Sequence, residues 1–436
     1  MKYYCIGIKG SGMATLAEIL FDLGNDVSGY DDYKEYKFTQ EGIDKRGIKI
    51  YYDTNHDIDK DTIVTYSKAF SMDHPEIKRV KQLGLKIIEY NELLGHLSAE
   101  FKTIGVSGTH GKTTTSTMIS TVLKQTKGCN YFIGDGTGFA DDKNKLFVLE
   151  SCEYKKHFLS YQPYYAVVTN IELEHTECYK DINEIIETFT LFANKANVVV
   201  ACGDDLNVRK MKLNNKVIYY GFNDDNDVVA KNVVLSKNGS EFDVYMNKKL
   251  YGHFDIPVFG DHMVLNALAC ITICDLEGVK KEDIHNTLET FSNAKRRFKE
   301  KVFGNVVTID DYAHHPTEIK VTIASARQKY PNKEIVAVFL PNTYSRTEAL
   351  MDDFVSALKS ADKAYVMDIH CDRENKEDYP NVSSDEIIKK VPGAEKISIQ
   401  TVDKLLKHDN AAICFMSCTN IYEIENKFEE LLKNKK

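Results

Sequence analysis

A strand, a glycine-rich loop and a helix follow one another between residues 101 and 123, and this succession constrains the fold more than any other feature of the sequence. An apolar run over 101–106 predicts the strand, and apolar residues at helical spacing after Lys112 predict the helix. The glycines between them let the backbone wrap around phosphate groups at the N-terminus of the helix. Lys112 can then reach the β- and γ-phosphates, and the hydroxyl of Thr113 can hold Mg²⁺. The segment therefore predicts a nucleotide-binding site at the edge of an α/β sheet.

The phosphate loop is a shortened variant of the common pattern, because that pattern requires a glycine at 106 and this chain has Val106. Free backbone N–H groups and a partial positive charge remain available at the start of the predicted helix. We therefore expect the phosphates to contact the loop and the first turn of the helix, through Gly108, Thr109, His110, Gly111, Lys112, Thr113 and Thr114.

Apolar strands alternate with amphipathic helices along the chain, which predicts an α/β protein with doubly wound sheets. Runs such as 146–149 and 198–202 are apolar throughout, as in parallel strands that are buried on both faces. A β-rich stretch with hairpin-like segments interrupts this pattern at 227–256. A chain of 436 residues also exceeds the size of one ordinary core. We predict a Rossmann-like domain, a central P-loop-like domain and a second Rossmann-like domain, over 1–98, 99–296 and 297–436.

A second glycine-rich loop follows the first predicted strand. Gly7, Gly10 and Gly12 precede a helical stretch, and Asp31 lies about 20 residues further on, as in dinucleotide-binding folds. The third glycine of that pattern is replaced by Thr15. Taken alone, the loop is compatible with a nicotinamide dinucleotide, with another nucleotide or sugar nucleotide, or with a purely structural turn.

The charge of the chain argues against a nucleic-acid or membrane-surface partner. The formal net charge is -9, so phosphate binding must depend on a few placed groups rather than on a diffuse positive field. No apolar run approaches the roughly 20 residues that cross a bilayer, and the N-terminus reads as a strand rather than a signal peptide. The ten cysteines form no zinc or disulfide pattern, and Cys270 and Cys274 have the spacing of neighbours on one face of a helix. We expect a cytoplasmic protein with reduced thiols and without membrane insertion.

Seven segments in a fixed order connect the sequence to a known family. They include both glycine loops, and the most specific of them is the string Asp-Asp-Tyr-Ala-His-His-Pro-Thr-Glu. The segments are 7–13, 108–113, 150–154, 169–175, 260–267, 295–298 and 310–318. Together they resemble the Mur ligases over essentially the whole chain, and the string at 310–318 resembles the alanine-adding branch of that family.

The resemblance implies an ATP-dependent ligase that uses Mg²⁺ and joins L-alanine to the carboxylate of UDP-N-acetylmuramate in peptidoglycan-precursor synthesis. In this family ATP phosphorylates the muramate carboxylate, and the amine then attacks the acyl phosphate. A carboxylate repels the γ-phosphate, so Lys112 and Mg²⁺ must neutralise charge during the transfer. The resemblance assigns the UDP-sugar to the first domain, ATP to the central domain and the amino acid to the third. We expect these small molecules as partners, and a monomer or weak homodimer.

The resemblance also implies roles for individual residues. The metal ligands would be Thr113, Glu150 and His175. Besides the phosphate loop, ATP would contact His262, Asn266 and Arg297. The UDP-sugar would contact Gly10, Ser11, Gly12, Met13, Asp31 and Ser67. The amino acid would contact Tyr312 and His314, and the catalytic residues would be Lys112, His314, His315 and Arg346.

Two stretches of the third domain depart from the family pattern. Relatives often have Phe-Gln-Pro-His where this chain has Phe-Leu-Pro-Asn at 339–342, and Gly-Ala-Gly-Asp where it has Ser-Cys-Thr-Asn at 417–420. Both stretches bear on the identity of the amino acid. The main alternative is therefore a recycling ligase that adds a preformed tripeptide to UDP-N-acetylmuramate.

Three further alternatives each leave a segment unexplained. A folate-type polyglutamating ligase does not account for the N-terminal glycine domain. A nicotinamide-dependent dehydrogenase does not account for the loop at 108–113. A non-catalytic nucleotide-binding scaffold does not account for the presence of Lys112, Glu150 and His175 together.

Overall fold

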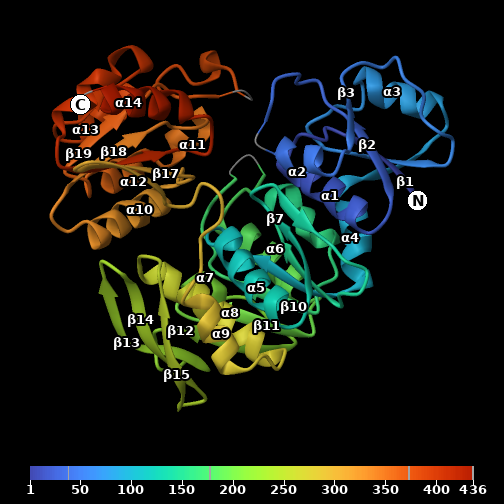
Figure 1. Cartoon of the computed structure of the whole chain (residues 1–436), viewed down its shortest axis with the longest axis horizontal. Helices are drawn as coiled ribbons and strands as arrows, with labels where there is room; N and C mark the ends of the chain where they lie inside the picture. Colours follow the sequence, from blue (N-terminus) through green and yellow to red (C-terminus); the bar gives the residue numbers. More distant parts are fainter. Residues whose placement is uncertain (38, 176–177, 372–373, 435–436) are drawn as a thin grey trace.

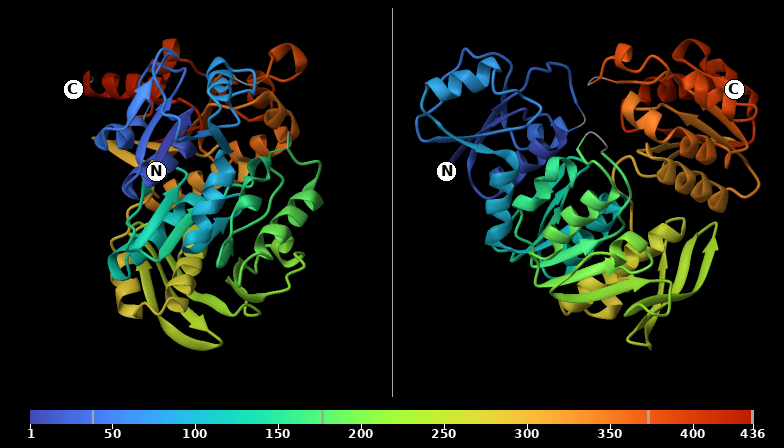
Figure 2. Two further views of the ribbon diagram at one scale, coloured as in Figure 1. Left: turned by 90° about the vertical axis from the view of Figure 1, so that its right-hand side faces the viewer. Right: turned by 180° about the vertical axis from the view of Figure 1, so that it is seen from behind.

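The computed structural model describes residues 1–37, 39–175, 178–371 and 374–434. In these residues the chain forms three α/β lobes, each built on its own sheet, so the predicted α/β fold with three sheet-based units is confirmed. Figure 1 shows the N-terminal and C-terminal lobes on opposite sides above the central lobe, and the view from behind in Figure 2 shows the same arrangement. Among the described residues, no helix is long and apolar enough to cross a membrane.

The N-terminal lobe contains a parallel sheet with the strand order β3-β2-β1-β4-β5. Its strands are Lys2–Ile6 (β1), Asp26–Tyr30 (β2), Lys49–Tyr51 (β3), Thr62–Tyr66 (β4) and Lys86–Glu89 (β5). Its helices are Ser11–Asp22 (α1), Gln40–Lys45 (α2), Pro75–Gln82 (α3) and Tyr90–Glu100 (α4). The order reverses between β1 and β4, and ligands of such sheets bind at this switch point, beyond the carboxyl ends of the strands.

The central lobe contains a ten-stranded sheet in the order β15-β14-β13-β12-β11-β10-β6-β9-β7-β8. Its strands are Lys102–Ser107 (β6), Cys129–Ile133 (β7), Thr137–Phe139 (β8), Leu146–Glu150 (β9), Tyr165–Val168 (β10), Val198–Cys202 (β11), Lys216–Gly221 (β12), Val228–Ser236 (β13), Gly239–Met246 (β14) and Lys249–Ile256 (β15). Its helices are Lys112–Thr126 (α5), Tyr154–Ser160 (η1), Ile182–Ala193 (α6), Leu206–Arg209 (α7), Asp261–Leu276 (α8) and Lys281–Leu288 (α9). The sheet is parallel from β7 to β13, and the pairs β13–β14, β14–β15 and β7–β8 are antiparallel.

The C-terminal lobe contains a six-stranded sheet in the order β16-β17-β21-β18-β19-β20, in which only the pairing of β16 with β17 is antiparallel. Its strands are Lys299–Phe303 (β16), Val306–Asp311 (β17), Glu334–Phe339 (β18), Lys363–Val366 (β19), Glu395–Lys396 (β20) and Ala411–Met416 (β21). Its helices are Pro316–Lys329 (α10), Tyr344–Ala349 (α11), Met351–Leu358 (α12), Lys376–Asp378 (η2), Ser384–Lys390 (α13), Ile399–Lys407 (η3) and Tyr422–Asn434 (α14).

The apolar runs of the sequence form the cores of these sheets. Strand β11 occupies the predicted range 198–202, and all six residues of β21 are buried, as parallel strands covered on both faces require. Cys270 and Cys274 face each other on the buried helix α8, with 4.0 Å between their sulfur atoms, and all ten cysteines are free. Their prediction as helical neighbours is therefore confirmed.

A cluster of charged side chains joins the N-terminal lobe to the central lobe. Glu18 of α1 accepts a hydrogen bond from the backbone N–H of Gly138 in β8, at 2.9 Å, and lies 3.2 Å from Arg46. Arg46 also pairs with Asp22 at 2.8 Å and donates to the carbonyl oxygen of Gly138 at 2.9 Å. Burial raises the pKa of Glu18 to about 7 despite these partners. These contacts fix α1 against the edge of the central sheet.

Candidate active site

The phosphate loop lies between β6 and α5 and is shaped by two glycines. Gly108 and Gly111 have φ angles of 143° and 82°, which residues with a side chain rarely adopt. A Cβ at Gly108 would lie 1.9 Å from the hydroxyl oxygen of Thr169, so only glycine fits there. Asn170 holds the loop through its side-chain oxygen, which accepts the N–H of His110 at 2.8 Å. These contacts hold the loop in its shape.

Lys112 is the first residue of α5, and its ammonium group turns back toward the loop. It donates to the carbonyl oxygens of Gly108 and Thr109 at 2.5 and 3.0 Å, and lies 2.9 Å from Oε2 of Glu153. Burial alone would lower the pKa of Lys112, but the charge of Glu153 raises it well above its ordinary value. Lys112 therefore stays a cation at the place where phosphates meet the start of a helix.

Thr113, in the first turn of α5, is in direct contact with Glu150, the last residue of β9. The Thr113 hydroxyl donates to Oε1 of Glu150 at 2.9 Å, and the N–H of Gly134 donates to Oε2 at 2.6 Å. Burial raises the pKa of Glu150, although the N–H of Gly134 and the charge of Lys112 act in the opposite direction. A hydroxyl and a carboxylate are oxygen ligands of the kind that Mg²⁺ takes, so these two residues fit the predicted metal site.

His175 contacts the same site through Glu153. Its Nε2 atom lies 3.7 Å from Oε1 of Glu153, and its ring lies 4.9 Å from that of Tyr154. Its backbone has a φ of 54°, which is uncommon for a residue with a side chain and often marks a functional site. Thr113 therefore contacts Glu150, and both Lys112 and His175 contact Glu153.

A cavity of about 470 Å³ extends from the phosphate loop into the gap between the central and C-terminal lobes. Residues from both lobes line it, including the predicted ATP contacts His110, Gly111, Thr114, His262, Asn266 and Arg297. Burial, assisted by the charge of Arg297, lowers the pKa of His262 to about 4, so His262 is neutral at pH 7. A Cβ at Gly111 would lie 2.8 Å from Oδ1 of Asn266, so α8 approaches the loop closely here. The cavity has the size of a small-molecule site.

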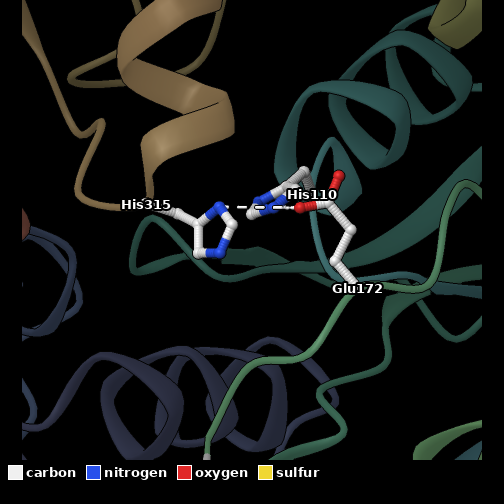
Figure 3. A group of neighbouring side chains, drawn as sticks. All are labelled: His110, Glu172 and His315. Carbon is white, nitrogen blue, oxygen red and sulfur yellow. Dashed lines mark ion pairs between the residues drawn. The ribbon is translucent and has the colours of Figure 1, made fainter. Parts of the chain in front are cut away.

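His110 connects the two lobes (Figure 3). Its Nε2 atom lies 3.4 Å from Glu172 of the central lobe, as drawn in Figure 3. Its Nδ1 atom lies 3.3 Å from Glu318 of the C-terminal lobe. Burial would lower the pKa of His110, but the two carboxylates raise it to about 9. His110, Glu172 and His315 also have possible metal-ligand atoms within 4.8 Å of one another. Because carboxylates lie at both nitrogens of His110, the contacts favour a protonated imidazole between the lobes.

The loop after β17 brings His314 and His315 to the cleft. His315 caps α10, because its Nδ1 atom accepts the N–H of Thr317 at 3.3 Å, and Glu318 completes the capping box. Burial lowers the pKa of His315 to about 4, so His315 is neutral at pH 7. His314 has its Nδ1 atom 3.0 Å from the carbonyl oxygen of Tyr312 and 3.1 Å from Glu318. A carbonyl oxygen can only accept, so Nδ1 of His314 carries the proton and Nε2 of the neutral ring is the basic nitrogen.

The Tyr312 ring and the Arg297 guanidinium group also meet at this loop. The guanidinium carbon of Arg297 lies 5.2 Å from the centre of the Tyr312 ring, within the range of a cation–π contact. Burial raises the pKa of Tyr312 to about 12, so its hydroxyl stays protonated. The predicted ATP contact Arg297 and the predicted amino-acid contact Tyr312 are therefore neighbours.

Arg346 lies within α11 and pairs with a residue of the central lobe. Its Nε and Nη2 atoms donate to Oε1 of Glu174 at 3.0 and 2.7 Å. Both side chains are largely buried. Burial would raise the pKa of Glu174, but Arg346 lowers it to about 2, so the pair is ionised at every physiological pH.

The predicted UDP-sugar residues gather at the switch point of the N-terminal sheet. Gly10 precedes α1, and Ser11, Gly12 and Met13 form its first turn, while Ser67 follows β4 and donates its N–H to Ile6 of β1 at 3.1 Å. Asp31 is buried, and its carboxylate accepts the N–H groups of Lys9 and Tyr33 at 2.9 and 3.0 Å. In this structure Asp31 therefore holds the glycine loop in place.

Four acidic residues of the site were not singled out by sequence reasoning, although all lie in the motif segments. They are Glu153, Glu172, Glu174 and Glu318. The capping-box position of Glu318, three residues after His315, is the one local signal that indicates a role. The partners of the other three come from distant segments, so spacing alone does not indicate them.

Family models match three successive parts of the chain. Residues 2–102 match the model described as Mur ligase family, catalytic domain, residues 106–274 match the Mur ligase middle domain, and residues 296–414 match the Mur ligase, glutamate ligase domain. The chain therefore belongs to the Mur ligase family, whose members are ATP-dependent ligases of peptidoglycan precursors.

Solved structures of this family have the same fold. UDP-N-acetylmuramate-alanine ligase MurC from Thermotoga maritima is similar over 100% of both chains, with 26% identity and a TM-score of 0.82. The murein peptide ligase Mpl from Psychrobacter arcticus matches over 100% of this chain and 99% of its own, with 21% identity and a TM-score of 0.71. MurF ligase from Thermotoga maritima, solved with ADP, matches over 86% and 90%, with 16% identity and a TM-score of 0.66.

Proposed function

We propose that the protein joins L-alanine to the carboxylate of UDP-N-acetylmuramate, with cleavage of ATP to ADP and phosphate, as a cytoplasmic monomer or weak homodimer. The observation that carries this proposal is the contact of His110 with Glu318, at 3.3 Å. It brings the phosphate loop of the central lobe against the His-His-Pro-Thr-Glu loop that resembles the alanine-adding branch. Similarity to the Thermotoga MurC over both whole chains supports the same substrates.

The first half-reaction would use the residues around α5. Lys112 would bind the β- and γ-phosphates and offset the repulsion between the γ-phosphate and the muramate carboxylate. Thr113 and Glu150, which are 2.9 Å apart, and His175, which lies 3.7 Å from Glu153, would hold Mg²⁺. Bound Mg²⁺ supplies Lewis-acid polarisation of phosphate oxygens. His262, Asn266 and Arg297 would contact the rest of ATP in the 470 Å³ cavity.

The second half-reaction requires a base, because the ammonium group of the amino acid must lose a proton before it attacks. His314 is better placed for this role than His315. The Nδ1 proton of His314 is fixed by Tyr312 and Glu318, which leaves Nε2 as a proton acceptor. The Nδ1 lone pair of His315 is instead engaged with the N–H of Thr317, as the cap of α10.

The UDP-sugar would bind at the N-terminal lobe. Ser11, Gly12 and Met13 would present N–H groups of the first turn of α1 to its diphosphate, next to Gly10 at the N-cap. Ser67 would contact it from β4, and Asp31 would act through the loop that it holds. The N-terminal glycine loop thus serves a sugar nucleotide rather than a nicotinamide cofactor.

The test is a comparison of ligands. ATP·Mg with UDP-N-acetylmuramate should raise the melting temperature, whereas NAD should not. Replacement of L-alanine by the stem tripeptide in the ligation assay separates this proposal from the recycling alternative. If turnover with the tripeptide equals or exceeds turnover with L-alanine, the recycling alternative is favoured instead.

A further inference from the structure

Two imidazoles and one carboxylate converge between the central and C-terminal lobes (Figure 3). They belong to His110 in the phosphate loop, Glu172 after β10 and His315 after β17. Nε2 of His110 and Nδ1 of His315 lie 3.4 and 3.6 Å from the same oxygen of Glu172, Oε2. Possible ligand atoms of all three residues lie within 4.8 Å of one another, so one cation could contact all of them.

The spacing of these atoms suits a cation with four ligands. Zn²⁺ binds imidazole nitrogen and carboxylate oxygen at about 2.0–2.2 Å in a tetrahedral arrangement, and the ligand atoms of such a tetrahedron are about 3.3–3.6 Å apart. The two distances from Oε2 of Glu172, 3.4 and 3.6 Å, lie in this range. The carboxylate and each imidazole are therefore already separated by the length that a shared cation requires.

The surroundings of His110 also fit a metal ligand. Its Nδ1 atom lies 3.3 Å from Oε1 of Glu318, and metal-bound histidines almost always donate their other ring N–H to such a group. Its Nε2 atom is buried and makes no hydrogen bond within the described part of the chain, although it approaches Glu172. Buried polar atoms usually have a partner. Glu318 thus orients the ring with Nε2 directed at the point where a cation would lie.

Thr317 positions the other two ligands. Its hydroxyl donates to Oε2 of Glu172 at 2.8 Å, and its N–H donates to Nδ1 of His315 at 3.3 Å. The second bond is longer than most hydrogen bonds from N–H groups, so little is lost when a cation takes the Nδ1 lone pair instead. His315 is only 5% exposed, and burial lowers its pKa to about 4, so its ring is in the neutral form that binds metals.

We propose that His110, Glu172 and His315 form a binding site for a divalent transition-metal cation, best matched by Zn²⁺, with water as the fourth ligand. Two imidazoles and one carboxylate are a ligand set of zinc sites that keep an open position. Mg²⁺ prefers six oxygen ligands, so this site differs in chemistry from the predicted Mg²⁺ site at Thr113 and Glu150. The inference goes beyond the proposed ligase function and does not depend on it.

A cation at this site joins the two lobes. His110 and Glu172 belong to the central lobe, and His315 belongs to the C-terminal lobe. The cation takes the place of the proton on Nε2 of His110 and connects the lobes through three coordinate bonds rather than through ion pairs. Because the unfolded chain does not hold these three side chains together, bound Zn²⁺ should raise the melting temperature of the protein.

Titration of the metal-free, full-length protein with Co²⁺ tests the site by absorption spectroscopy. Co²⁺ substitutes for Zn²⁺, and tetrahedral Co²⁺ absorbs visible light far more strongly than octahedral Co²⁺. Excess Mg²⁺ in the solution keeps the oxygen-rich site occupied. We expect tetrahedral bands that saturate at one cation per chain and disappear when Zn²⁺ is added. Absence of these bands, or near-ultraviolet sulfur-to-cobalt bands that indicate cysteine ligands, would overturn the assignment.

Two variants remove one ligand each. Glu172→Gln removes the carboxylate charge, and His315→Asn removes the imidazole but keeps an oxygen that can cap α10. Each should lose the tetrahedral bands and bind Zn²⁺ at least about a hundredfold more weakly, since loss of even an outer hydrogen-bond partner of a ligand costs about 10- to 100-fold in affinity. Zn²⁺ should no longer raise their melting temperatures. Melting curves without metal show whether each variant is folded.

Two further variants are the matched controls. His175→Ala removes the imidazole at the predicted Mg²⁺ site, and His253→Ala removes an exposed histidine that also lies beside a carboxylate, 2.9 Å from Asp243. Both should keep the wild-type cobalt spectrum and the wild-type affinity for Zn²⁺. Tetrahedral bands that persist in Glu172→Gln and His315→Asn, or that disappear in His175→Ala, would place the cation elsewhere and overturn the proposal.

Discussion

Lys112 and Glu153 form a buried ion pair whose removal should separate stability from catalysis. Their side chains are 14% and 3% exposed and 2.9 Å apart. Lys112→Met keeps most of the length of the side chain but leaves Glu153 as a buried carboxylate without its lysine partner. Removing one partner of a buried ion pair lowers the free energy of unfolding by about 3–5 kcal/mol. For a domain of this size that corresponds to a decrease of roughly 10 °C in melting temperature.

The double variant Lys112→Met/Glu153→Gln should recover most of this stability, because both charges are then absent. It should recover no activity, since loss of the phosphate-binding cation lowers the rate of ADP formation by at least about a hundred- to a thousandfold. Calorimetry and an ADP-release assay on the wild type and three variants, Glu153→Gln included, complete the cycle. Near-normal ADP formation by Lys112→Met, or a double variant as unstable as the single one, would refute the reasoning.

Three other variants test neighbouring parts of the account. Glu150→Gln should raise the Mg²⁺ concentration for half-maximal activity, and an unchanged Mg²⁺ titration would remove Glu150 from the metal site. His110 has a raised pKa of about 9, so its stabilising contribution is complete below about pH 6.5 and is lost as the pH rises through about 9. The difference in melting temperature between wild type and His110→Gln should therefore shrink from pH 7 to pH 10; a constant difference would contradict the pairing with Glu172 and Glu318. Glu18 has a pKa raised to about 7, so it destabilises the fold as the pH rises from about 4.5 to 7, by roughly 3 kcal/mol in all. Glu18→Gln should thus be more stable than the wild type at pH 8 but not at pH 4.5, as denaturant titrations at the two pH values would show.

Features that depend on local sequence were predicted well. The phosphate loop, the strand at 198–202 and the two cysteines on α8 each follow from a short pattern with one physical reading. Strands β7 and β8 were not predicted. They are short, three glycines lie at 134, 136 and 138, and β8 is held by α1 of another lobe. Such strands gain their stability from tertiary contacts rather than from propensity.

The acidic partners of the site were missed for a related reason. Glu153 lies 41 residues from Lys112 along the chain, and Glu174 lies 172 residues from Arg346. The sequence around a loop carboxylate does not indicate which cation the carboxylate will pair with, because the pairing depends on how the lobes pack. The domain limits 1–98, 99–296 and 297–436 and the roles of the individual site residues stay predictions.

Release of phosphate from ATP·Mg reports directly on the proposed ligation of L-alanine to UDP-N-acetylmuramate. The assay should contain UDP-N-acetylmuramate with either L-alanine, glycine, L-serine, the stem tripeptide or no acceptor. We predict rapid release only when the UDP-sugar and a small free amino acid are both present, with L-alanine the best acceptor. Preference for the tripeptide, or no release with any acceptor, would contradict it.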